Sequence, residues 1–314
     1  MMFKLRYPLV LLLTISIALN IYLVFFASKE KIVDAVSEKS SRYPFLAKRI
    51  FLENASDVVV NFVDLRQKLR DYDTKSFFPI GIYFQYLPTG VAIGVNETKP
   101  FTSASLLKVP TVMMVYKMIE EGKVKEDQLL EIKEEHLDQG YGDLWRVGAG
   151  TKITVKEAIE KSLVESDNTA HNLLYELSGG APLEVFKYLD IPSQVLDGQA
   201  VVTTRNYSSI LRSLFFSAYL NFENSNEIIA LLTKAKHGEA LRADVPEEVK
   251  VALKIGVFEQ QEGGSANTYG NCGIFYVPNR NYVLCVMYTG TGQEANTKTR
   301  DISNMVYDFV KNLK

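Results

Sequence analysis

Two polar residues at the start of an apolar stretch have the types and spacing needed for nucleophilic catalysis. Ser105 and Lys108 lie three residues apart in FTSASLLKVPTVMMVYK, residues 101–117. In a helix, residues at this spacing share one face, so the lysine amine would lie within reach of the serine hydroxyl. Such a lysine can accept a proton only if burial or another cation lowers its pKa well below about 10.4. The same S-x-x-K pattern occurs at Ser28 and Lys31, so the pattern alone does not define a site.

Two other elements have residues that could complete such a site. Lys254 interrupts the apolar run VALKIGVF and precedes Ile255 and Gly256. It could supply the second cation, although a lysine in a strand more often lies at a sheet edge and points to water. The triplet Ser166-Asp167-Asn168 lies between two predicted helices, where these residue types also serve as caps and turn residues. Each element taken alone is therefore more often structural than catalytic.

The elements that must position these residues predict an α+β domain. Apolar residues from Val58 to about Tyr72 recur at helical spacing, and two strand-like runs joined by Pro88-Thr89-Gly90 predict a β-hairpin. The middle of the chain is helical, with a capping box at Thr154 and Glu157. Three strand-like runs and an amphipathic helix follow. This order indicates one α+β domain of about 240 residues.

The three elements occur in the order S-x-x-K, S-D-N and K-x-G, in helix, inter-helix and strand contexts. With this order and these contexts, the sequence resembles the class A β-lactamase and penicillin-binding serine hydrolase superfamily. The resemblance runs from about Val58 to the C-terminus and includes FTSASLLK, SDNTAHNLL and TTRNYSSILRSL. It implies a five-stranded antiparallel sheet with flanking helices and a helical subdomain. It also implies that the protein acts on β-lactam or D-Ala-D-Ala-type cell-wall amides.

The resemblance assigns chemical roles to three motif residues. Ser105 would be the nucleophile that attacks an amide carbonyl and forms an acyl-enzyme. Lys108 would take its proton, kept neutral for part of the time by burial and by repulsion from Lys254. Ser166 would relay a proton to the leaving nitrogen.

The resemblance also assigns the groups that bind substrate. Asn168 would bind both the lysine base and the substrate's side-chain amide, and Lys254 would attract a substrate carboxylate. Gly256 would leave room for substrate backbone against the strand. The backbone N–H groups of Ser105 and Val257 would form the oxyanion hole, which is worth about 10²–10³ in rate per donor.

The third motif departs from the family pattern. Ile255 stands where the family has a hydroxyl residue that helps to bind the carboxylate, so we expect weaker carboxylate binding, or binding by Ser265 or Asn267. The stretch GYGDLW, residues 140–145, lies where the family has a loop at the mouth of the site. Tyr141 or Trp145 could therefore wall the pocket, and core packing is the alternative for Trp145.

A second departure concerns deacylation. Class A β-lactamases carry a glutamate in an E-x-x-L-N loop that activates water, whereas the corresponding YLDIPSQVLDGQAVVTTRN is shorter and lacks glutamate. Its acids, Asp190 and Asp197, do not stand in the family pattern, and Asp197 is most simply a turn residue. We therefore expect a persistent acyl-enzyme, as in a D,D-peptidase, a transpeptidase or a slow hydrolase. The alternative is a receptor or tether that binds penicillin or peptidoglycan without turnover.

The N-terminal residues predict a membrane anchor. Lys4 and Arg6 precede an uncharged run, residues 7–27, which is long enough to cross a bilayer core and exceeds the usual signal-peptide region of roughly 7–15 residues. The run leads into SKEK without a cleavage signal, and a cleaved signal peptide is the alternative. We expect a signal anchor over residues 1–28, a stalk over 29–57 and the hydrolase domain over 58–314, on the extracytoplasmic side of the cytoplasmic membrane.

Composition and histidine spacing limit the expected partners. The 314 residues are 47% hydrophobic and 23% charged, with a net charge of −2, so no polybasic surface points to nucleic acid. His136, His171 and His237 have no metal-ligand spacing with one another. We expect no metal, no cofactor and a monomer, whose partners are a small-molecule or cell-wall peptide substrate and the membrane.

The two cysteines flank the turn VPNRN near the end of the chain. If Val277 pairs with Tyr282 across this turn, Cys285 lies opposite Ile274 and diagonal to Cys272. Diagonal neighbours in a sheet are about 7–8 Å apart, which exceeds the reach of a disulfide. We therefore expect two buried, unbridged thiols.

Overall fold

The computed structural model describes residues 15–17, 62–74, 76, 78, 80–196, 198–259 and 267–313. The chain separates into two units, residues 1–53 and 54–314, and all three motifs lie in the second. In the first unit, the described residues 15–17 are helical. Within the described ranges, no helix combines the length and apolar character needed to cross a bilayer. Most of the predicted span over residues 7–27 lies outside these ranges, so the anchor stays a prediction.

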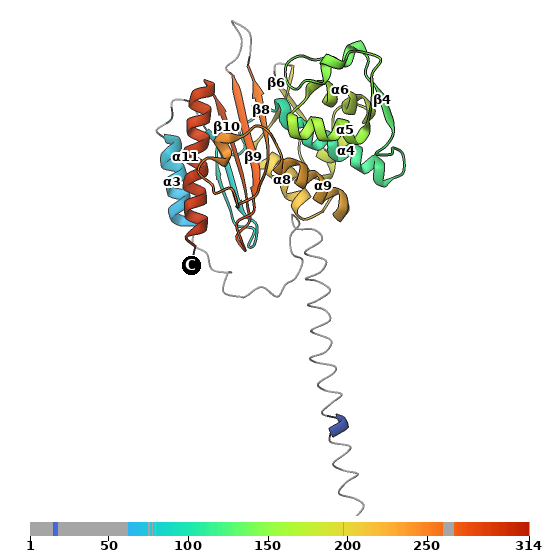
Figure 1. Ribbon diagram of the computed structural model, residues 1–314. Helices are drawn as coiled ribbons and strands as arrows, with labels where there is room; N and C mark the ends of the chain where they lie inside the picture. Colours follow the sequence, from blue (N-terminus) through green and yellow to red (C-terminus); the bar gives the residue numbers. More distant parts are fainter. Residues whose placement is uncertain are drawn as a thin grey trace, which may run out of the picture. The chain divides into compact units, whose positions relative to one another are not determined.

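A five-stranded antiparallel sheet forms the main layer of the second unit (Figure 1). Its strand order is β2-β1-β10-β9-β8. The strands are β1 Ile80–Tyr86, β2 Ala92–Val95, β8 Val251–Phe258, β9 Thr268–Phe275 and β10 Tyr282–Thr289. The predicted hairpin is confirmed, because β1 and β2 pair with Phe84 opposite Ile93. Lys254 lies on β8, an edge strand, but its side chain is buried, so the alternative of a lysine that points to water is wrong.

Helices cover both faces of this sheet. Helices α3 Val63–Thr74 and α11 Gly292–Lys311 lie side by side on one face, and α8 Thr204–Phe215 packs against β1, β9 and β10 (Figure 1). The main core lies between the sheet and the α3–α11 layer, where Leu65 and Ile302 are fully buried. β9 and β10 are consequently buried along almost their whole length.

The helical subdomain carries the first two motifs. The predicted helix over residues 105–121 begins as a 3₁₀ turn, Ala104–Leu107, and continues as α4, Lys108–Glu120. The predicted capping box is confirmed, because Thr154 and Glu157 satisfy each other's backbone N–H groups at the start of α5. The other helices are α5 Val155–Glu160, α6 Asn168–Leu177, α7 Leu183–Tyr188, α9 Phe222–Thr233 and α10 Glu239–Arg242.

Five short strands, which the sequence patterns did not indicate, connect these helices. They are β3 Phe101–Thr102, β4 Leu129–Glu131, β5 Lys152–Thr154, β6 Gln194–Leu196 and β7 Gln199–Val202. β3 pairs with β7, so the segment that leads into the 3₁₀ turn is tied to the segment before α8.

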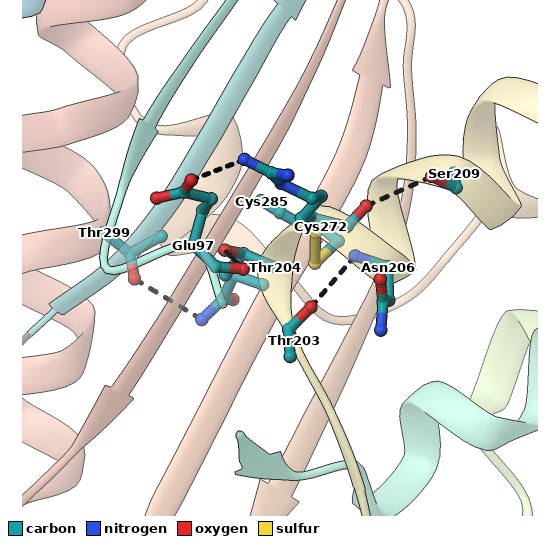
Figure 2. The surroundings of a disulfide bond; sticks show 10 residues. Glu97, Thr203, Thr204, Asn206, Ser209, Cys272, Cys285 and Thr299 are labelled. Atoms are coloured by element: carbon teal, nitrogen blue, oxygen red, sulfur yellow. Dashed lines mark hydrogen bonds and ion pairs between the residues drawn. A yellow bond between two sulfur atoms is a disulfide. The ribbon is translucent and has the colours of Figure 1, made fainter. Parts of the chain in front are cut away.

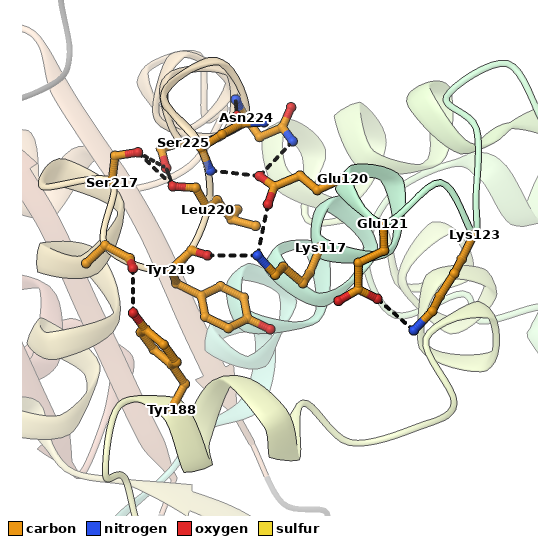
Figure 3. A network of polar contacts seen from close by, with 12 residues as sticks. Lys117, Glu120, Glu121, Lys123, Tyr188, Ser217, Tyr219, Leu220, Asn224 and Ser225 are labelled. Atoms are coloured by element: carbon orange, nitrogen blue, oxygen red, sulfur yellow. Dashed lines mark hydrogen bonds and ion pairs between the residues drawn. The ribbon is translucent and has the colours of Figure 1, made fainter.

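A polar network holds the far end of α4 in place (Figure 3). Lys117 forms an ion pair with Glu120 at 3.0 Å and donates to the carbonyl oxygen of Tyr219 at 3.4 Å. Glu120 in turn accepts hydrogen bonds from the backbone N–H of Asn221 at 2.7 Å and from Asn224 Nδ2 at 3.0 Å. The hydrogen bonds of Lys117 and Glu120 fix the C-terminal end of α4 to the segment at the start of α9. Lys108 lies at the opposite end of α4.

The prediction of two free thiols is wrong, because Cys272 and Cys285 form a disulfide. Tyr282 pairs with Phe275 and not with Val277, which places Cys285 directly opposite Cys272 at a Cα–Cα distance of 4.1 Å. Both strands are buried on both faces, so no alternation of polar and apolar residues marks their register. Figure 2 shows the disulfide beside the first turn of α8.

Candidate active site

Ser105 lies in the 3₁₀ turn that precedes α4, and this turn packs against strand β8. A Cβ atom added at Gly256 would lie 2.6 Å from the carbonyl oxygen of Ser103 and 3.0 Å from Leu106. Because those distances leave no room for a side chain, Gly256 lets β8 lie directly against the turn that carries Ser105. This packing explains the glycine of the third motif, and its predicted contact with substrate backbone stays a prediction.

Two buried lysines converge on one serine hydroxyl. Lys254, 2% exposed, donates to Ser166 Oγ at 2.8 Å, and Lys108, also 2% exposed, donates to the same oxygen at 3.3 Å. Lys108 Nζ also donates to the carbonyl oxygen of Ser166 and, at 2.6 Å, to Asn168 Oδ1. The structure therefore joins the three motifs, which come from α4, the turn before α6, and β8.

The backbone conformation of Ser166 makes this convergence possible. Ser166 has φ 58° and ψ 30°, in the left-handed region, and follows a π-helical segment, Lys161–Glu165. This conformation is uncommon for a non-glycine residue and is found at functional sites. It allows both the carbonyl oxygen and the hydroxyl of Ser166 to face Lys108.

Burial lowers the pKa of Lys108 to about 7, and the nearby carboxylates of Asp167 and Asp138 oppose this change. Burial also lowers the pKa of Lys254 well below its usual range, and the charge of Lys108 lowers it further. The predicted requirement for a lysine base, a lowered pKa, is thus present at Lys108. Its main cause is burial and not the charge of Lys254.

The loop of residues 138–144 folds onto the S-D-N segment. Asp167 is the N-cap of α6, where it accepts the N–H of Ala170 at 2.8 Å, and it also accepts the N–H of Leu144 at 2.9 Å. Asp167 therefore serves as a helix cap, the structural alternative that the residue types of the triplet allow. The backbone N–H of Asn168 donates to the carbonyl oxygen of Tyr141 at 2.9 Å. A Cβ atom at Gly142 would overlap the Asp167 carboxylate, so glycine is needed for this close approach.

Asp138 is a site residue that the sequence patterns did not indicate. Its Oδ1 accepts hydrogen bonds from Asn168 Nδ2 at 2.9 Å and from the N–H of Gly140 at 2.7 Å. The signal in the sequence is the pair of glycines in this loop, Gly140 and Gly142, since each allows a close approach to the S-D-N segment.

The two aromatic residues of the same loop lie in different surroundings. Tyr141 is 38% exposed and contacts His237 edge to face at 6.1 Å. Trp145 is half-buried, and the guanidinium of Arg146 lies 4.6 Å from the centre of its ring. Leu144, and not Trp145, belongs to the buried cluster of this subdomain. Whether either aromatic ring walls a pocket stays a prediction.

The remaining predicted residues are placed on or near β8. Val257 is half-buried and pairs with Tyr269, and Ile255 pairs with Asn271 and packs against the main core. Asn267 lies just before β9, and Ser265 falls outside the described residues. The predicted oxyanion hole and carboxylate contacts stay predictions.

Of the two acids considered for deacylation, the structure describes Asp190. Asp190 is exposed in a left-handed turn after α7, with φ 53°. Asp197 lies outside the described residues, and its role as a turn residue stays a prediction.

Two clusters among the described residues have the ligand types that bind metals. Glu135, His136 and Glu176 bring their donor atoms within 4.8 Å of one another. Glu176, however, is already paired with Lys133 at 2.5 Å and with His136. These ion pairs account for the cluster, and we assign no metal to it.

The second cluster consists of Asp143, Glu165 and Asp167. Asp143 and Glu165 both pair with Lys161, at 3.2 Å and 3.3 Å, and Asp167 caps α6. These contacts account for the second cluster, and we assign no metal to it either.

Comparison with known proteins identifies a family and a shared fold. Residues 64–310 match the Beta-lactamase2 model, described as the Beta-lactamase enzyme family. Similar solved structures include PBP-A, which is 21% identical with a TM-score of 0.73 over 80% of this chain and 97% of that chain. A β-lactamase from Sphaerobacter thermophilus DSM 20745 is 18% identical with a TM-score of 0.71, over 80% of this chain and 98% of that one. A β-lactamase from Chitinophaga pinensis DSM 2588 is 19% identical with a TM-score of 0.70, over 78% and 98%.

At these identities, the solved structures show a shared fold, and the family model covers most of the chain. The chain therefore belongs to the Beta-lactamase2 family, whose α+β fold and antiparallel sheet were implied by the resemblance of its motifs. The family prediction is confirmed.

Proposed function

We propose that this protein is a membrane-anchored, penicillin-recognising serine acyl-enzyme that acts on β-lactam or D-Ala-D-Ala-type cell-wall amides. The observation that carries the proposal is the hydroxyl of Ser166 held between two buried lysines, Lys108 and Lys254. Lys108, with its pKa lowered to about 7, can be neutral at physiological pH and can accept a proton.

In this proposal the proton follows the hydrogen bonds that join the lysines to Ser166. Neutral Lys108 takes the proton of Ser105 as its oxygen attacks the amide carbonyl, and the C–N bond of the tetrahedral intermediate then breaks. Ser166 gives its own proton to the leaving nitrogen and regains one from protonated Lys108. Lys254, hydrogen-bonded to Ser166 and positively charged when protonated, would attract the substrate carboxylate.

We infer slow deacylation from the loop between α7 and α8. Its sequence contains no glutamate, and its described acid, Asp190, is exposed. The likeness to PBP-A supports acylation by penicillin, because a Leu-to-Glu variant of PBP-A is described as an acyl-enzyme complex with penicillin G. The alternative is a receptor or tether that is acylated by a β-lactam without turnover, or that only binds peptidoglycan.

Two features support a location outside the cytoplasm. The uncharged run over residues 7–27 follows two basic residues and suits a signal anchor. The Cys272–Cys285 disulfide independently favours an oxidising compartment, because disulfides rarely persist in the cytosol.

Labelling with a fluorescent penicillin tests the proposal. The full-length protein should become covalently labelled, and Ser105→Ala should abolish labelling while leaving the thermal unfolding temperature nearly unchanged. Ser28→Ala is the matched control, because Ser28 stands in the other S-x-x-K pattern of the chain, and this variant should label normally. Undiminished labelling of Ser105→Ala would remove Ser105 from the mechanism, and a wild type that never labels would reject the proposed function.

A further inference from the structure

We propose that Asp138 is a positioning residue for the proposed acylation site, and that its carboxylate fixes the orientation of the Asn168 amide. In that orientation the amide oxygen faces Lys108, and one amide hydrogen remains for the substrate. The inference rests on the proposed function, to which it adds a residue outside the three motifs.

The contacts of Asn168 show how the orientation is selected. Asn168 Nδ2 donates to Asp138 Oδ1 at 2.9 Å, and Asn168 Oδ1 accepts from Lys108 Nζ at 2.6 Å. An ionised carboxylate can only accept hydrogen bonds, and an ammonium group can only donate them. A flipped amide would place its oxygen against the carboxylate and its NH₂ group against the ammonium. The carboxylate therefore excludes the flipped amide whether Lys108 is protonated or neutral, and protonated Lys108 excludes the same orientation.

The loop holds Asp138 itself in place. Thr169 Oγ1 accepts the backbone N–H of Asp138 at 3.0 Å, and the N–H of Gly140 donates to Asp138 Oδ1 at 2.7 Å. A Cβ atom at Gly140 would lie 3.0 Å from both Asn168 Nδ2 and Asp138 Oδ1. Glycine at this position thus lets the loop close around the hydrogen bond between Asp138 and Asn168.

The carboxylate also acts on Lys108 through its charge. Asp138 and Asp167 both raise the pKa of Lys108 and so oppose the effect of burial. The other titratable groups that face this lysine are Lys254, whose pKa lies well below its usual range, and His171, whose pKa is lowered to about 3. His171 is therefore neutral near pH 7, and removal of the Asp138 charge should let the pKa of Lys108 fall.

The test compares Asp138→Asn with Asp143→Asn in the full-length protein. Asp143 is the matched control, because it lies in the same loop, is exposed and pairs with Lys161 at 3.2 Å. The first measurement is the pH dependence of acylation by a fluorescent penicillin, and the second is an NMR titration of the Lys108 Cε signal, assigned by its loss in Lys108→Arg.

In Asp138→Asn we expect the Lys108 titration and the acid limb of the acylation rate to move to lower pH by about one pH unit. An asparagine at this position can donate as well as accept, so both amide orientations of Asn168 become populated. We expect the plateau rate of acylation to fall about twofold if the two orientations are equally populated, and up to about tenfold, the effect of losing one hydrogen bond to the substrate, if the flipped orientation dominates. Asp143→Asn should match the wild type in both measurements.

If Asp138→Asn has the same Lys108 titration and the same plateau rate of acylation as the wild type, the inference is overturned. Asp138→Glu, which keeps the charge, covers the case in which Asp138→Asn unfolds, and its Lys108 titration should stay near the wild-type value. A shift to lower pH in the glutamate variant would reject a role for the charge. If the wild type is never acylated, the proposed function fails, while the NMR titration still decides whether Asp138 acts on Lys108.

Discussion

Lys108 and Lys254 show how two cations share one small polar site. Both are buried, and both donate to the hydroxyl of Ser166. Burial lowers the pKa of both amines, and the charge of Lys108 lowers that of Lys254 further, so the state in which both are protonated is disfavoured. In the proposed mechanism Lys108 acts as the base, and Lys254 binds the substrate carboxylate when it is protonated.

The pH dependence of acylation follows from Lys108. Below about pH 7 Lys108 is protonated and cannot accept the proton of Ser105, and above that value it becomes neutral. We expect the acylation rate constant to rise through about pH 7 and then to level off. Rapid-mixing measurements with a chromogenic penicillin between pH 5 and pH 9 check this, and a rate that is independent of pH across the range would exclude Lys108 as the base.

At the scale of elements, the loop of residues 138–144 holds the S-D-N segment from outside. Backbone and side-chain hydrogen bonds join the loop to Asp167, Asn168 and Thr169. The segment between α5 and α6 is therefore positioned by a neighbouring loop as well as by its own cap. Glycines in that loop set how closely the two segments approach.

Substitution of Gly142 and of Gly150 distinguishes the contact between the loop and Asp167 from the effect of backbone strain. Gly142 and Gly150 both have φ +85°, but an added Cβ meets Asp167 at Gly142 and nothing within 4 Å at Gly150. Gly150→Ala should therefore cost only the left-handed strain of about 1–2 kcal/mol. Gly142→Ala should lower the thermal unfolding temperature further and slow acylation about tenfold or more, because it displaces Asp167. Equal effects of the two variants on acylation would contradict a role for the loop in positioning the S-D-N segment.

Much of the fold is predictable from local sequence patterns. The hairpin of β1 and β2, the capping box at Thr154 and the order of the final strands follow from residue periodicity and turn residues. The disulfide does not, because β9 and β10 are buried on both faces and their sequences contain no alternation that sets the register.

The candidate site is also predictable only in part from the sequence. The three motifs are recognisable because each places a reactive residue type in a regular element. Asp138 lies in an irregular loop, and its contact with Asn168 depends on how that loop folds back across 30 residues of sequence. Nothing in local periodicity predicts such a contact, whereas the glycines beside it are a weaker signal of close approach.

At the scale of the whole molecule, the chain joins an uncharged N-terminal run to a disulfide-containing enzyme domain. We expect the mature protein to keep its N-terminus and to partition with membranes, because Lys4 and Arg6 precede the run and no cleavage signal follows it. Cell fractionation with N-terminal sequencing checks this expectation. A mature N-terminus beyond Ala27 in the soluble fraction would rule out the anchor.

Mass spectrometry of the full-length protein mixed with excess penicillin tests the persistent acyl-enzyme most directly. In the proposed mechanism Ser105, Lys108 and Ser166 serve acylation, while the loop between α7 and α8 contains no glutamate to activate the second water. We expect a burst of about one equivalent of product, a slow steady state and an adduct that accumulates on the peptide containing Ser105. Consumption of penicillin at many turnovers per second with no adduct at any time would contradict slow deacylation, and Asp197 would then be the first residue to test as the deacylation base.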